Sequence, residues 1–105
     1  MTLIVLNFKT YRESTGSEAL ALARICEDMA LEHSLEMVVV PQVADISTIA
    51  AAVSIPVFSQ HVDGVGYGGF TGHITAASLK AVGAAGSLIN HSERRLRLAE
   101  IEASI

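Results

Sequence analysis

The sequence predicts an α/β fold in which parallel strands alternate with helices, in the order β-α-β-α-β-α-β-α. Two observations predict it. Four short runs rich in Val, Leu and Ile are separated by segments whose apolar residues recur at helical spacing. The runs are nearly continuous in apolar residues, as expected of strands buried on both faces of a parallel sheet. Each segment between them is long enough to return the next strand parallel to the last, so the order fits a doubly wound sheet or part of a barrel.

The first strand and the first helix are predicted from the N-terminal third of the chain. The strand covers the apolar run Leu3–Phe8. The helix is expected over Ser17–Glu32, with Ser17 as its N-cap. Its buried stripe is expected to contain Leu22, Ile25, Cys26 and Met29. Because Cys26 is the only cysteine, we interpret it as a buried structural thiol.

Three further strand–helix pairs complete the pattern. The strands are expected over Met37–Val40, Val57–Gln60 and Ser87–Asn90. The helices are expected over Ala44–Ala52, from the N-cap Thr75 to Gly83, and over a stripe formed by Leu98, Ile101 and Ile105. The sequence ends within this last amphipathic pattern, so we expect the fourth helix to be interrupted and residues 1–105 to form one unit.

Composition excludes several classes of protein. Half of the 105 residues are apolar and 17% are charged, which is typical of one soluble globular domain. The net charge of −4 offers no basic surface for nucleic acid or anionic lipid. No apolar run reaches the length of a membrane span, and the N-terminus lacks the cationic region of a signal peptide. A cytoplasmic location is therefore expected.

Polar residues follow the predicted strands at their C-terminal ends. Asn7 and Lys9 follow the first strand, Gln60 the third and His91 the fourth. In parallel α/β folds these ends lie on one side of the sheet, where ligands bind, so the four residues are expected to share a polar rim. Taken singly, Lys9 fits a solvated lysine and His91 a packed histidine. If His91 opens a helical turn, however, nearby backbone N–H groups disfavour the imidazolium and leave a neutral hydrogen-bond donor.

Two other kinds of site have weaker support. The glycines of the segment 64–69 satisfy G-x-G-x-x-G, but the next helix is predicted to begin only near Thr75, which is too late for a dinucleotide-binding turn. His61, His73 and His91 match no spacing of metal ligands. We therefore expect neither a cofactor nor a metal.

Four segments resemble motifs of the triosephosphate isomerase family. They are Asn7–Tyr11, in a form typical of archaeal members, Val57–Val62, Gly69–Ile74 and Asn90–Arg95. The resemblance implies that Asn7 and Lys9 contact the substrate and that His91 is the electrophile that polarises its carbonyl. It also implies that Glu93 is a buried residue supporting the site. Gln60 and Thr71 would lie at a subunit interface, where the third loop reaches into a neighbouring subunit.

The resemblance implies interconversion of dihydroxyacetone phosphate and glyceraldehyde 3-phosphate, in glycolysis and gluconeogenesis. A complete barrel has eight strands and about 250 residues, so this chain corresponds to the N-terminal half of a (βα)8 domain. The family's catalytic base, a glutamate, belongs to the sixth strand. The chain alone is therefore expected to be inactive unless another carboxylate, Glu13 first, replaces that base. A non-catalytic half-barrel that serves interaction or oligomerisation is the alternative, and the open strand edges predict self-association.

Overall fold

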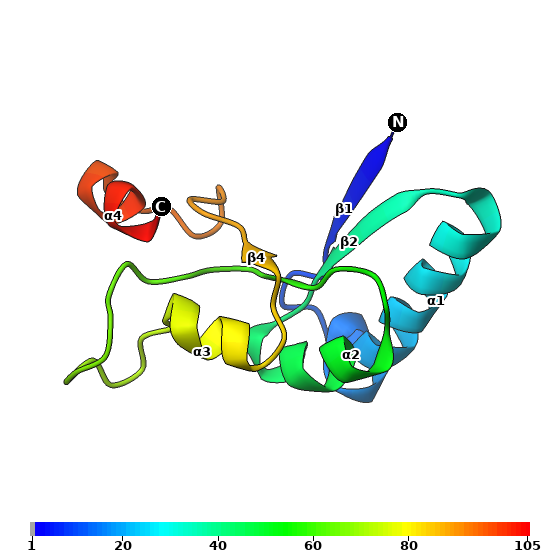
Figure 1. Cartoon of the computed structure of the whole chain (residues 1–105), viewed down its shortest axis with the longest axis horizontal. Coiled ribbons are helices and arrows are strands. Elements are labelled where there is room, and N and C mark those ends of the chain that lie inside the picture. The colour runs from blue at the N-terminus through cyan, green and yellow to red at the C-terminus, as the bar shows by residue number, and fades with distance from the viewer. Residues whose placement is uncertain (1) are drawn as a thin grey trace.

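A computed structural model describes residues 2–105 and confirms the alternation of strands and helices (Figure 1). The elements are β1 (Leu3–Asn7), α1 (Ser17–His33), β2 (Glu36–Val40), α2 (Ile46–Ala52), β3 (Phe58–Ser59), α3 (Ala76–Ala81), β4 (Gly86–Ser87) and α4 (Leu98–Ser104). Short 3-10 turns at Arg12–Ser14 and Val43–Asp45 precede α1 and α2. Figure 1 shows α1 and α4 at opposite ends of the molecule.

The strands pair in parallel and in sequence order, which is the topology of a partial barrel. β1 pairs with β2 along five residues, and β3 pairs with β4 along two. A single bridge between Val39 and Val57 joins the two pairs. The third strand is shorter than the predicted Val57–Gln60, and the fourth begins one residue before the predicted Ser87–Asn90 and ends three residues before its end. Backbone hydrogen bonds from Ala85 N–H to Val57 O and from Leu88 N–H to Ser59 O flank the paired residues. The chain leaves the ladder soon afterwards, at the left-handed residue Asn90.

The core lies where α1 and α2 pack against β2. Ile46, Ile49 and Val39 are fully buried there. In β2 the four residues Met37–Val40 are all buried, as predicted for a strand covered on both faces. The same prediction is wrong for β1, where Leu3, Ile4 and Val5 are 57%, 36% and 47% exposed. Within residues 2–105 β1 pairs with β2 alone, so its other edge and part of its surface face solvent.

The buried stripe of α1 differs from the predicted one. The residues that face the core are Ala19, Ala23, Cys26 and Ala30. Ile25 and Met29 are instead 57% and 42% exposed. Leu22 of the predicted stripe is partly buried and packs against the core, as Cys26 does. The alanines at the remaining buried positions have small side chains, which suit close packing of a helix against a sheet. The burial of Cys26 is confirmed and raises the pKa of its thiol, as expected of an unreactive structural cysteine.

Two predicted helix ends had different outcomes. Thr75 is confirmed as the N-cap of α3, since its Oγ1 accepts the N–H of Ser78 at 3.2 Å, and Gly83 follows the helix with φ +101°. Ser17 is not the N-cap of α1, because Gly16 occupies that position with φ +63°. The N–H of Gly16 donates to the carboxylate of Asp45 at 3.1 Å, so a distant residue helps to fix the start of the helix.

None of the helices in the described part of the chain has the length and apolar character needed to cross a membrane.

Candidate functional site

The polar rim predicted from the strand ends is present. Asn7, Lys9, Gln60 and His91 line one cavity of about 200 Å³, together with Thr10, His61, Leu88, Glu93 and Arg94. These residues come from segments more than 80 positions apart. The parallel topology brings them together because all four strands end on the same side.

Lys9 lies in a strained backbone conformation at the end of β1. Its φ is +53°, in the left-handed region that side-chain-bearing residues rarely adopt. Such a residue costs on the order of 1–3 kcal/mol and persists only where its surroundings enforce it. The Lys9 N–H donates to Asn7 Oδ1 at 2.9 Å, which closes a tight turn. The Nζ of Lys9 then lies 3.4 Å from Glu93 Oε2, across the cavity mouth from β1.

A second residue with a strained backbone lies next to His91 in the chain. Asn90 directly precedes His91 and has φ +61°. Its side-chain Oδ1 accepts the N–H of Leu96 at 2.8 Å and so holds the segment that leads to α4. Asparagine tolerates this region better than most residues do. Lys9 itself and the residue before His91 are thus both left-handed, and backbone strain of this kind gathers at functional sites.

His91 is oriented by the turn that follows it. Its Nδ1 accepts the backbone N–H of Glu93 at 3.0 Å, which leaves Nε2 as the ring nitrogen that can donate to a ligand. The prediction that a backbone N–H group contacts the imidazole of His91 is confirmed, although the turn that supplies it does not continue into a helix. The segment after β4 forms a single turn, closed by Arg94 N–H and His91 O at 2.7 Å, and α4 begins only at Leu98.

Glu93 contacts both candidate electrophiles without being buried. The prediction of a buried glutamate is wrong for this structure, because its side chain is 58% exposed at the open mouth of the cavity. Its carboxylate pairs with Lys9 Nζ, and Oε1 lies 3.9 Å from His91 Nδ1. Exposed ion pairs contribute about 0–1 kcal/mol to stability. The pair therefore orients Lys9 more than it stabilises the fold.

Gln60 faces the interior of its own chain. Its Nε2 donates to the backbone oxygens of Lys9 and Val40 at 2.9 Å and 3.3 Å, and to Asn7 Oδ1 at 3.4 Å. These acceptors come from β1, β2 and the turn that carries Lys9. The assignment of Gln60 and Thr71 to a subunit interface stays a prediction.

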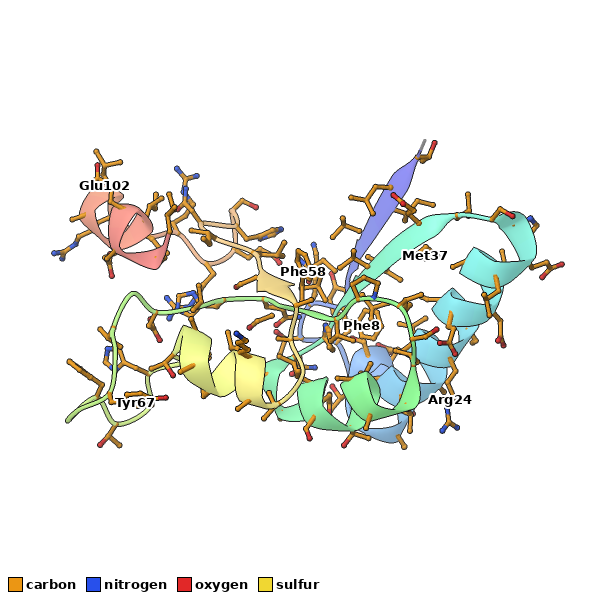
Figure 2. The ribbon with its side chains drawn as sticks, viewed as in Figure 1. Phe8, Arg24, Met37, Phe58, Tyr67 and Glu102 are labelled. Carbon is orange, nitrogen blue, oxygen red and sulfur yellow. The ribbon has the colours of Figure 1, made fainter. Side chains whose placement is uncertain are left out.

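Thr71 lies in a long exposed loop between β3 and α3. Tyr67, labelled in Figure 2 on this loop, is 91% exposed, and Phe70 is 42% exposed. The base of the loop is closed by Asp63, whose N–H donates to Ile74 O at 2.7 Å and whose Oδ2 accepts the Ile74 N–H at 2.7 Å. Sequence reasoning missed Asp63, although an Asp-Gly pair after a strand end is a turn signal.

His61 takes part in the same closure. Its Nε2 lies 2.8 Å from Asp63 Oδ1, and its side chain is 9% exposed.

No group of three or more His, Cys, Asp or Glu side chains in residues 2–105 lies close enough to hold a metal ion. The glycine run of this loop ends before Thr75, the N-cap of α3, so the geometry of a dinucleotide-binding turn is not formed.

We predict that Asp63 holds the loop closed in a pH-dependent way. Desolvation raises the pKa of its carboxyl, but the Ile74 N–H and His61 outweigh this and leave the pKa below its usual value. A carboxyl whose pKa is lowered by folding stabilises the closed loop above its unfolded-state pKa, about 3.9, and loses this effect as the pH falls through its folded-state pKa. Asp63→Ala is expected to speed hydrogen exchange of the Ile74 amide about tenfold at neutral pH.

Hydrogen exchange followed by NMR checks this prediction. Asp28→Ala is the matched control, because Asp28 is an exposed carboxylate on α1, far from the loop in sequence. Unchanged exchange at Ile74 in Asp63→Ala, or an equal change in the control, would show that Asp63 does not close the loop.

Comparison with known proteins gives one consistent result. A family model described as triosephosphate isomerase matches residues 2–105. The chain is similar to the triosephosphate isomerase of Methanosarcina acetivorans, with 54% identity over 102 residues that cover 97% of this chain and 46% of that protein. It is also 51% identical to the triosephosphate isomerase of Methanosarcina barkeri, in a match that covers 100% of this chain and 47% of that protein. The identity to the triosephosphate isomerase of Methanocaldococcus jannaschii is 48%, in a match that covers 98% of this chain and 47% of that protein. The chain therefore spans slightly less than half the length of these curated relatives.

Proposed function

Since this chain belongs to the triosephosphate isomerase family, we propose that its polar rim supplies the electrophilic half of an isomerase site. The observation that supports this most directly is the single cavity of about 200 Å³ that contains Asn7, Lys9 and His91. The proposed reaction interconverts dihydroxyacetone phosphate and glyceraldehyde 3-phosphate, as in glycolysis and gluconeogenesis. We place it in the cytoplasm.

The proposed chemistry divides between donors and a base. A carboxylate removes the proton on the carbon next to the substrate carbonyl, and the electron pair of that C–H bond forms the enediol double bond while negative charge develops on the carbonyl oxygen. The Nε2–H of His91 donates to this oxygen, and the ammonium of Lys9 stabilises its charge and that of the phosphate. Fixed donors of this kind need no reorganisation as the charge develops. Asn7 orients Lys9 and contacts the substrate.

The base is proposed to lie outside these 105 residues. By resemblance to the family it is a glutamate of the sixth strand, and the loops that hold the phosphate also come from later strands. Glu13, an exposed residue of the 3-10 turn after β1, is the first substitute to consider in this chain.

We also propose a homo-oligomer formed through the loop that carries Thr71. The exposed Tyr67 and Phe70 provide apolar contact area, and the Asp63 closure reduces the freedom that binding would otherwise remove.

A second candidate function is a non-catalytic interaction module. The observation that favours it is β1, whose outer edge is unpaired within residues 2–105 and whose Leu3, Ile4 and Val5 are exposed. An edge strand of this kind pairs readily with another chain. A monodisperse monomer in sedimentation experiments would contradict this alternative.

Turnover measured in two proteins tests the proposed isomerase function. The first is the 105-residue chain, which is expected to show no turnover above background. The second is a chimera in which this chain replaces the matching segment of the Methanosarcina acetivorans relative, which would supply the base and the phosphate loops. The chimera is expected to be active. A folded chimera without turnover would contradict the proposal, and turnover in the isolated chain would show that the base lies within it.

A further inference from the structure

Gln60 makes contacts that neither the family resemblance nor the predicted interface role explains. The amide nitrogen of this half-buried side chain has three acceptors within 3.4 Å, and all of them belong to the chain itself. Its shortest hydrogen bond, at 2.9 Å, goes to the backbone oxygen of Lys9. The acceptor is thus the carbonyl of the residue with the strained φ of +53°.

The hydrogen bonds around Lys9 hold its peptide groups on both sides. Asn7 Oδ1 accepts the Lys9 N–H at 2.9 Å, and Gln60 Nε2 donates to the Lys9 carbonyl. Gln60 also donates to the same Asn7 Oδ1 at 3.4 Å, so one amide group joins both ends of the strained residue. Its third contact, to Val40 O, anchors this arrangement to the buried strand β2.

We infer that Gln60 is a positioning residue that holds Lys9 in the left-handed conformation and thereby directs the Lys9 ammonium into the cavity. Without these donors, the Lys9 backbone returns to a negative φ, which L-residues prefer. The direction of its Cβ then changes, and Nζ leaves its place 3.4 Å from Glu93. The importance of this placement for turnover rests on the proposed function, but the placement itself does not.

The substitution Gln60→Glu removes the hydrogen-bond donor of the side chain and keeps its shape. A carboxylate has nearly the shape of the amide but accepts only, so it faces three oxygen acceptors with no hydrogen to donate. Gln60→Met also removes the donor and adds no charge, and it keeps the test in place if the charged variant does not fold. Gln42→Glu is the matched control, because the side-chain amide of Gln42 donates to Ser14 O and Thr15 Oγ1 rather than to Lys9.

NMR of the 105-residue chain reads the conformation of Lys9 directly. A strong intraresidue amide–Hα NOE, the signature of a positive φ, is expected for Lys9 in the unchanged chain and in Gln42→Glu. It is expected to weaken in both Gln60 variants. In the unchanged chain, Glu93→Gln is expected to shift the Lys9 Nζ resonance, and this response is expected to vanish in the Gln60 variants. If Gln60 had a merely structural role, the Lys9 Nζ resonance would still respond to Glu93→Gln in the Gln60 variants.

The outcomes separate this inference from the proposed function. A positive φ at Lys9 retained in a folded Gln60 variant, with the response to Glu93→Gln intact, would overturn the inference whatever the chimera does. Loss of both signals in the Gln60 variants would support it, even if the chimera proved inactive. Loss of both in Gln42→Glu as well would overturn it, since the effect would then not be specific to Gln60.

Discussion

Replacement of His91 by alanine is expected to lower the turnover of the chimera about 10²–10³-fold, which is the usual effect of removing one donor to a developing oxyanion. The structure gives the physical reason. The Glu93 N–H donates to Nδ1, which leaves Nε2 as the ring nitrogen that can donate to a substrate oxygen. Steady-state kinetics with dihydroxyacetone phosphate measure the effect, which is expected mainly in kcat because the interaction strengthens as charge develops.

Ser92→Ala is the matched control, because Ser92 is an exposed neighbour in the same turn. It is expected to keep turnover within a few-fold of the unchanged chimera. Near-normal turnover in His91→Ala would mean that another group polarises the carbonyl, and the electrophilic role proposed for His91 would be wrong.

Replacement of Ile49 by alanine is expected to destabilise the isolated chain by about 2–5 kcal/mol, the usual cost of truncating a large aliphatic side chain in a core. Ile49 is fully buried in the cluster formed by α1, α2 and β2. Native domains are stable by about 5–15 kcal/mol, so a loss of this size is a large fraction of the free energy of unfolding. Urea denaturation followed by circular dichroism is expected to show a large loss of stability or an unfolded chain.

Ile25→Ala provides the control with identical chemistry on a different surface. Ile25 is 57% exposed on α1, so its truncation is expected to change stability by about 0.5 kcal/mol or less. The comparison also tests the buried face of α1. Equal losses in the two variants would show that Ile25 packs into the core, as the apolar pattern alone suggested.

The sequence predicted the order of strands and helices because each element depends on a local pattern. The continuous apolar run of β2 and the N-cap Thr75 are properties of a few adjacent residues, and both were found where expected. The buried face of α1 was predicted wrongly. Hydrophobicity favoured Ile25 and Met29 as buried residues, but both are exposed. The alanines of α1 are buried instead, and their small side chains suit close packing against the core.

The shared cavity was predictable, and the way its residues are held was not. Parallel topology alone brings the ends of β1, β3 and β4 to one side, and this placed Asn7, Lys9, Gln60 and His91 together. The left-handed backbone of Lys9, the inward amide of Gln60 and the exposed carboxylate of Glu93 each depend on contacts between segments far apart in the chain.

By itself, then, the sequence determined the α/β class, the strand order and the family, because periodicity, parallel connections and short motifs are all written in neighbouring residues. Only the tertiary structure decided which helix face is buried, how Asp63 closes the exposed loop and how Gln60 holds Lys9. Packing volume and hydrogen bonds between distant segments determine these features, and no local pattern of residue types encodes them.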